Sequence, residues 1–200
     1  MSELLAFISL GFRHIVNPEA ADHILFLLAL AAIYRPRDWR DALWVVTAFT
    51  VGHSITLALA VTNALVLPTA WIEFLIPVTI VATGIENLLV RDRVHTLWGG
   101  RYRPVFSGVF GLVHGAGFAN YLRSLFVDRV AVPLFGFNVG IELGQLLVLI
   151  AAGLVFVAAD RGLERLSRPG ALGAVRLRVV GVSMVVILVA TRWALQRAPW

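Results

Sequence analysis

Long apolar runs separated by short polar segments dominate the pattern along the chain. An apolar helix needs about 20 residues, within a range of roughly 17–25, to cross the hydrocarbon core of a bilayer. Five runs are long enough: Ala42–Thr62, Trp71–Val90, Val105–Leu122, Val130–Ala159 and Val179–Leu195. The pattern therefore predicts five membrane-spanning helices after the first 40 residues.

The first 34 residues form a less regular apolar stretch that polar residues interrupt. In Asn17-Pro18-Glu19 the Asn is a good N-cap, the Pro suits the first helical position, and the acid complements the helix dipole. We therefore expect a helix from there to about Tyr34, which would span about 25 Å and make a slightly short crossing. The preceding segment, Leu4–Val16, is too short to cross alone. It is predicted to be a half-helix, re-entrant or lying at the interface, that places His14 beside the next helix start.

These elements predict an all-α fold in one transmembrane domain over residues 1–200. The bundle would have six crossings plus the N-terminal half-helix, or seven if that half-helix also spans. Composition agrees, because 59% of the residues are hydrophobic, 14% are charged and the mean hydropathy is +0.84. Almost no chain is left for a soluble domain, and a GxxxxGK[ST] phosphate loop is absent, which excludes an ATP-driven pump complete in one chain. The lack of Cys excludes disulfides, thiolate metal sites and cysteine nucleophiles.

Charge placement predicts the orientation of the bundle. All 17 basic residues are Arg, and twelve of them fall on one side of the predicted bundle, in alternate joins between spans. By the positive-inside rule that side is cytoplasmic, so both termini should face outward, in a protein of the bacterial inner membrane. The arginines form no continuous basic face, which argues against a nucleic-acid partner and leaves the lipid bilayer as the expected surrounding.

Several ionisable residues lie within the predicted spans. A charged side chain at the bilayer centre costs about 2.5–3.5 kcal/mol on insertion scales, so such residues are functional candidates. Helical rise places three of them near the midplane, one near the cytoplasmic end and a pair near the outer end. These are, respectively, His53, His114 and Glu142; Glu86; and Asp22 with His23. Thr50 shares a helix side with His53, and Asn138 and Gln145 share one with Glu142.

Imidazole and carboxylate together are ligands for borderline divalent cations such as Ni²⁺, Co²⁺ and Zn²⁺. Copper(I) is a poor match, because the chain has no Cys and only two Met. Asp22 beside His23 suggests a carboxylate that sets an imidazole tautomer. Structural interpretations stay open: a mid-span His can be an interhelical hydrogen-bonding contact, and Glu86 can cap the end of its helix.

Six short motifs, in the same order and covering about residues 7–195, resemble the HupE/UreJ membrane proteins. The motifs are Gly11–Ile15, Asp22–Leu28, Thr47–Leu57, Glu86–Leu88, Phe110–Ala119 and Phe137–Gln145. The resemblance implies association with hydrogenase or urease maturation and nickel or cobalt uptake by a permease or diffusion facilitator. It also implies metal-pathway positions at His14, Asp22, His23, Glu86 and His114, with His53 and Glu142 inside matching motifs. The wide separation of His14 from Asp22/His23 resembles the second, less characterised branch of the family.

Three functions follow as hypotheses. The first is a divalent-metal permease with a route from His14, Asp22 and His23 outside, through His53, His114 and Glu142, to Glu86 inside. The second is an intramembrane zinc-dependent hydrolase, although HExxH and GxSG motifs are absent. The third is a membrane metal-binding accessory protein. The sequence leaves the metal species, the energy coupling and the oligomeric state open.

Overall fold

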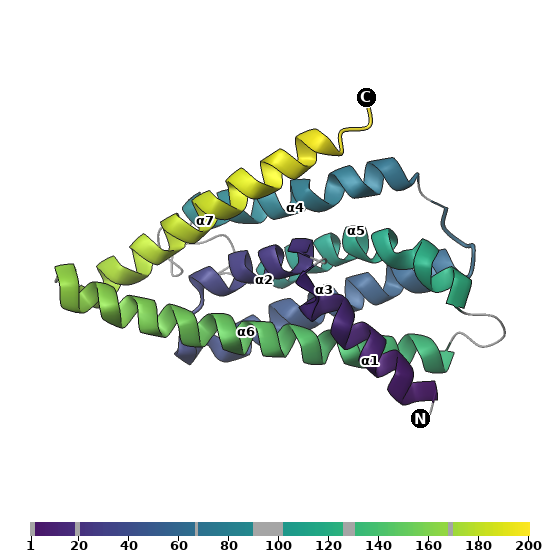
Figure 1. Cartoon of the computed structure of the whole chain (residues 1–200), viewed down its shortest axis with the longest axis horizontal. Coiled ribbons are helices and arrows are strands. Elements are labelled where there is room, and N and C mark those ends of the chain that lie inside the picture. Colours follow the sequence, from purple (N-terminus) through teal and green to yellow (C-terminus); the bar gives the residue numbers. More distant parts are fainter. Residues whose placement is uncertain (1–2, 19–20, 67, 90–101, 126–130, 168–169) are drawn as a thin grey trace.

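A computed structural model describes residues 3–18, 21–66, 68–89, 102–125, 131–167 and 170–200. The described residues form helices and contain no strand, which confirms the all-α fold. The helices are α1 (Glu3–Val16), α2 (Ala21–Ile33), the short 3-10 helix η2 (Pro36–Asp38), α3 (Trp39–Val61), α4 (Thr69–Leu89), α5 (Tyr102–Leu125), α6 (Ala131–Ser167) and α7 (Gly170–Gln196). The long helices run along one bundle, and both termini lie at the same end of it (Figure 1).

The first two helices form a bent pair. α1 and α2 meet at an angle of 69° around Pro18, where the sequence predicts a helix start. α1 runs from the end that holds the termini to about the middle of the bundle, and α2 continues toward the opposite end (Figure 1). The prediction of a short first helix is confirmed. The expected position of Asp22 and His23 at the outer end is wrong, because the break lies midway along the bundle.

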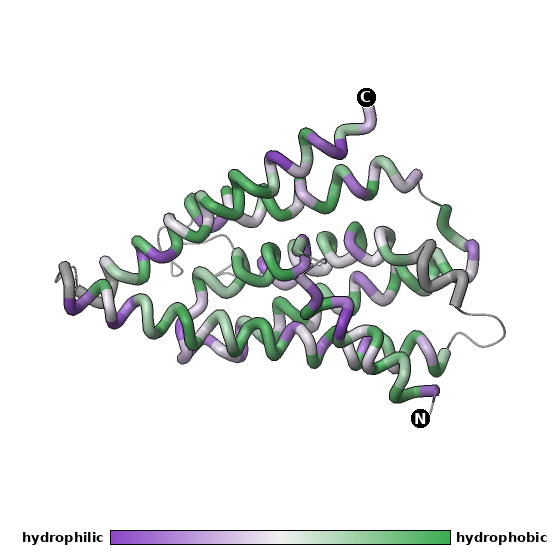
Figure 2. Tube along the Cα trace, in the orientation of Figure 1, coloured by the Kyte–Doolittle hydropathy of each residue, from purple (hydrophilic) through white to green (hydrophobic). Residues whose placement is uncertain are grey.

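Four described helices are long and apolar enough to cross a membrane, and the bent α1–α2 pair would be a fifth. Figure 2 shows hydrophobic residues along most of each long helix and hydrophilic residues near the α1–α2 break. Large apolar side chains such as Leu154, Leu188 and Val105 are exposed on outer faces. A soluble bundle would bury such faces, whereas lipid covers them in a membrane. These features indicate an integral membrane protein. The count of six crossings and the outward termini stay predictions.

Glycines allow two helix pairs to approach closely. A Cβ added at Gly140 of α6 would lie 2.1 Å from the carbonyl oxygen of Ile8 in α1. A Cβ added at Gly111 of α5 would lie 2.1 Å from the carbonyl oxygen of Phe49 in α3. Neither helix pair could keep its spacing with a larger residue, because the obstacle is backbone. The resulting contacts hold α1 and α3 in fixed positions against α6 and α5.

Replacing Gly140 with Ala should therefore destabilise the fold. The added methyl group forces α1 away from α6, and overpacking of this kind costs about 1–3 kcal/mol. Thermal unfolding of the purified protein in detergent measures the effect. Gly181→Ala is the matched control, because no atom lies within 4 Å of a Cβ added there. Equal melting temperatures for the two variants would contradict this account of the α1–α6 contact.

The arginines that were expected in the last join lie in helices. α6 continues through Arg161 and Arg165 to Ser167, and Arg178 is a buried residue of α7. The guanidinium of Arg178 donates to Asp160 Oδ2 at 2.6 Å and to the carbonyl oxygens of Ala32 and Tyr34 at 3.1 and 3.2 Å. The helices thus extend into the join that the apolar runs predict between Ala159 and Val179, because a carboxylate and carbonyl oxygens of other helices satisfy the Arg178 charge.

Candidate metal centre

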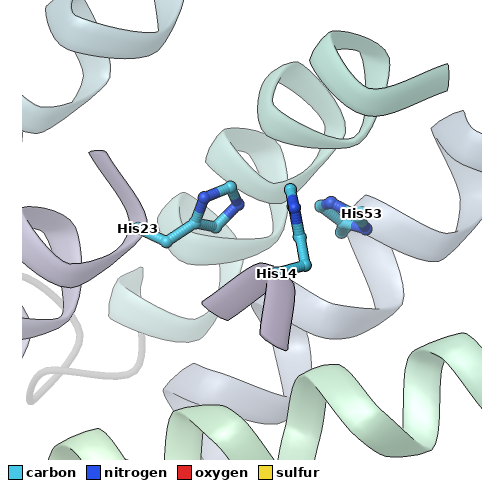
Figure 3. Close-up of side chains that lie close together, drawn as sticks. All are labelled: His14, His23 and His53. Carbon is cyan, nitrogen blue, oxygen red and sulfur yellow. The ribbon is translucent and has the colours of Figure 1, made fainter. Parts of the chain in front are cut away.

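Four histidines from four helices come together at the α1–α2 break. His14 lies near the end of α1, His23 near the start of α2, and His53 and His114 lie within α3 and α5. The ring centroids of His14 and His23 are 4.6 Å apart, those of His23 and His114 are 5.3 Å apart, and His53 lies 6.3 Å from His14. Figure 3 shows the rings of His23, His14 and His53 side by side, each from a different helix. The bend between α1 and α2 creates this cluster, because it turns two helix ends toward α3 and α5.

Three of these residues have the geometry of a metal site. One nitrogen from each of His14, His23 and His53 lies within 4.8 Å of the others. Zinc–nitrogen bonds are about 2.0–2.1 Å long, so two nitrogens on one ion are at most about 4.2 Å apart. The observed separations of up to 4.8 Å are slightly larger than this, so the three side chains would have to move closer together to bind one cation. We call His14, His23 and His53 the histidine triad.

The imidazole nitrogens of the cluster are buried without hydrogen-bond partners in the described chain. They are Nε2 of His14, Nε2 of His23, both nitrogens of His53 and Nδ1 of His114. More than nine in ten buried polar groups in proteins are hydrogen-bonded, and an unsatisfied one costs about 1–3 kcal/mol. Because a neutral imidazole has one nitrogen lone pair, the four rings offer four such lone pairs, and their burial in one place suits a ligand that binds nitrogen lone pairs.

Asp22 orients one ring of the triad. Its Oδ1 lies 3.1 Å from Nδ1 of His23 and also accepts the backbone N–H of His23 at 2.9 Å. An ionised carboxylate can only accept, so Nδ1 of His23 carries the proton and Nε2 presents a lone pair. This is the carboxylate–histidine arrangement that accompanies metal-binding imidazoles. The contact predicted from the adjacent residues is present.

His114 is oriented by Thr79 of α4. The Thr79 hydroxyl donates its proton to the carbonyl oxygen of Ile76 at 2.7 Å and lies 3.0 Å from Nε2 of His114. Because the hydroxyl has one proton, Nε2 of His114 is the donor in the second contact and Nδ1 carries a lone pair. His114 thus offers a further nitrogen beside the triad.

Aromatic side chains form the walls around the histidines. The rings of Phe118 and Phe137 stack at 5.3 Å, and the His14 ring lies 4.0 Å from Phe118. On the other side, Phe49 lies 5.1 Å from His114 and 6.3 Å from His23. These apolar walls lower the local dielectric on the sides of the cluster that they cover, which strengthens the interaction of the nitrogens with a cation.

A cavity of about 740 Å³ reaches the histidines from the end of the bundle that holds the termini. His14, His23, His114 and Asp22 line its depth, and Glu73 of α4 and Arg197, after α7, line it nearer that end. Charged and polar side chains therefore line this space as far as His14, His23 and His114. We call this space the outer cavity.

Toward the opposite end, aromatic residues and an ion pair lie between the cluster and the surface. Phe26 contacts both Phe49 and Phe110, with ring centroids 4.9 and 6.3 Å apart. Beyond them, only about 20 Å³ of space remains beside Glu86 and Arg103. The outer cavity thus ends at the histidines.

A family model described as HupE / UreJ protein matches residues 1–197. The chain belongs to the HupE/UreJ family. This confirms the resemblance inferred from the six motifs. No curated protein and no solved structure matches the chain significantly.

The structure of this HupE/UreJ protein does not bring Glu86 to the histidine cluster. Both Glu86 oxygens accept hydrogen bonds from Arg103, one at 2.9 Å from Nε, and Tyr102 also donates to Glu86. Burial acts to lower the pKa of Arg103, which precedes the predicted span, but the Glu86 carboxylate outweighs burial and raises this pKa above its ordinary value. Arg103 also donates to Asn87, whose amide donates to the carbonyl oxygen of Ala29. Glu86, Asn87 and Arg103 together therefore join α2, α4 and α5.

In this HupE/UreJ protein, Glu142 and Gln145 of α6 form hydrogen bonds with threonines of α3. Oε1 of Glu142 accepts the Thr47 hydroxyl at 3.0 Å, and Oε1 of Gln145 accepts the Thr50 hydroxyl at 2.9 Å. Among the described residues, Glu142 is not part of the group of converging ligand atoms. The shared site expected for His53, His114 and Glu142 is thus replaced by the histidine triad. Asn138 keeps a buried Oδ1 with no partner in the described chain.

Two residues that matter in this geometry were missed by sequence reasoning. Arg103 pairs with Glu86 of another helix, which the order of residues along the chain does not show. Glu73 is an exposed residue of α4 that lines the outer cavity. No signal in the sequence distinguishes Glu73 from other interfacial acids. The joins at 90–101, 126–130 and 168–169 lie outside the described residues, so the arginines predicted there are not placed.

Proposed function

We propose that this HupE/UreJ protein binds and conducts a divalent transition metal through the histidine triad. The observation that carries the proposal is the convergence of one imidazole nitrogen from each of His14, His23 and His53 to within 4.8 Å of one another. Imidazole ligands suit nickel, cobalt and zinc, and the family is associated with nickel and cobalt transport. Asp22 contributes a negative charge, which offsets part of the cation charge in a low-dielectric site. A metalloenzyme-maturation system is the expected recipient of the metal.

The geometry suggests how a metal ion would move. The ion enters the outer cavity, exchanges water for nitrogen at the triad, and meets the aromatic layer of Phe26, Phe49 and Phe110. Release at the other end requires that layer and the Glu86–Arg103 pair to separate. Several weak sites along a route allow an ion to both bind and leave.

Flux measurement tests the proposal. Proteoliposomes with the wild-type protein should take up Ni²⁺ or Co²⁺ in a saturable way. Asp22→Asn keeps the size and an acceptor oxygen for His23 but removes the charge, so the half-saturating concentration should rise about 10- to 100-fold with a smaller loss of maximal flux. Glu73→Gln is the control for a general effect of negative charge in the cavity. It should raise the half-saturating concentration less than Asp22→Asn does. Wild-type flux from Asp22→Asn would contradict the role of the triad.

A zinc-dependent hydrolase is the second candidate. Three imidazoles around a cation leave a position for water, as in catalytic zinc sites, and the outer cavity reaches two of them, His14 and His23. One tightly held zinc ion per chain, metal-dependent amide or ester hydrolysis and no flux would favour this function. A tightly held ion without flux or hydrolysis would favour an accessory metal-binding protein.

A further inference from the structure

A second cavity, unrelated to the histidines, opens at the end of the bundle opposite the termini. It has a volume of about 440 Å³ and lies between the α2–α3 junction and the second half of α6. Its walls are almost entirely apolar, with Leu149, Ile150 and Leu154 on the α6 side. Ligand-sized pockets range over about 300–1,000 Å³, so the space suits one long apolar group. We call it the side groove.

The charged residues that line the side groove are two arginines. Arg178 is neutralised by Asp160, and its guanidinium also donates to carbonyl oxygens of Ala32 and Tyr34. Arg35 is half-buried, and its guanidinium forms no ion pair with a carboxylate that the structure describes. The groove therefore combines an apolar floor with one uncompensated positive charge.

A tryptophan and the arginine that follows it place the side groove at the level of lipid headgroups. Trp39 lines the groove and is 55% exposed, and the Arg40 guanidinium lies 5.3 Å above its ring. Exposed Trp and Arg at helix ends are typical of the membrane–water interface. Arginine placement predicts this end to be cytoplasmic, where anionic lipids attract basic pockets between helices.

We propose that the side groove binds one anionic phospholipid, with its phosphodiester on Arg35 and an acyl chain along α6. One phosphate charge matches the one unpaired guanidinium, and Arg suits phosphate because its fork of donors binds two oxygens. The bound lipid ties α2, α3 and α6 together at the end where the Glu86–Arg103 pair lies.

Gly153 provides a direct way to block the groove. It lines the side groove, and no atom lies within 4 Å of a Cβ added there. Gly153→Phe thus places a ring in the groove from a position that has room for a Cβ, and the ring would compete with an acyl chain. Gly181→Phe is its matched control, because Gly181 is equally open and is not part of the groove lining. Arg35→Gln removes the charge, and Arg37→Gln, at a residue whose side chain is 76% exposed, is the control for that change.

Native mass spectrometry of the purified protein with added phosphatidylglycerol or phosphatidylcholine tests the proposal. We expect one retained phosphatidylglycerol per chain, bound more tightly than phosphatidylcholine. Arg35→Gln should weaken its retention about tenfold, the value of one charge-assisted hydrogen bond. Gly153→Phe should abolish it, while Arg37→Gln and Gly181→Phe keep it. Equal retention of the two lipids, or full retention by Gly153→Phe, would overturn the proposal, and each variant's melting temperature shows that it is folded.

Discussion

Replacing His53 with Gln should reduce the affinity for Ni²⁺, Co²⁺ or Zn²⁺ more than about 100-fold. Loss of a hydrogen bond that supports a metal ligand costs about 10- to 100-fold in affinity, and loss of the ligand itself should cost more. His53 is fully buried, and neither of its nitrogens has a hydrogen-bond partner in the described chain. The substitution therefore removes the proposed metal ligand without breaking a hydrogen bond of the ring. Metal stoichiometry and isothermal titration measure binding, and the melting temperature without metal should stay close to that of the wild type.

His114→Gln is the matched control for this prediction. Nε2 of His114 is already bound to Thr79, and a Gln amide can replace that contact. Its loss of affinity should be below about tenfold, because the His114 nitrogen lies outside the triad. If His53→Gln retains wild-type affinity, or if both variants lose affinity equally, the three-histidine site is wrong.

Replacing Arg103 with Gln should destabilise the protein by about 3 kcal/mol. Arg103 and Glu86 have side chains that are only 10% and 22% exposed, and their paired hydrogen bonds connect α4 with α5. The change leaves the Glu86 carboxylate largely buried without its cation, which is the costly part of breaking such a pair. Thermal unfolding in detergent measures this effect.

The double variant Glu86→Gln/Arg103→Gln separates the ion pair from general packing. It should recover most of the lost stability, because neither charge is then left unpaired. Arg37→Gln is the control for an exposed pair: Arg37 lies 3.9 Å from Asp38, and its loss should cost less than about 0.5 kcal/mol. A double variant as unstable as Arg103→Gln alone would exclude the ion pair as the source of the effect.

The helix break illustrates how far sequence reasoning reaches. Asn17-Pro18 correctly predicted the end of one helix and the start of another, because Pro lacks an amide proton and constrains its own backbone. The depth of the break was misjudged, since the following helix was taken as a full crossing. α1 instead packs against α6 through Gly140 and reaches the middle of the bundle. That contact moves His14 and His23 to the level of His53.

The sequence alone was sufficient to predict the all-α class, the membrane environment, the short first helix and the family. Hydropathy, local helix signals and motif order carry these predictions, and all three depend only on the order of residues along the chain. The partners of the polar side chains depended on helix packing. Glu86, Glu142 and His53 all lie in apolar helices, yet Arg103 neutralises the first, Thr47 binds the second and the third has no partner in the described chain. Helical spacing gives the direction of a side chain around its own axis, whereas close contacts between different helices decide which group it meets.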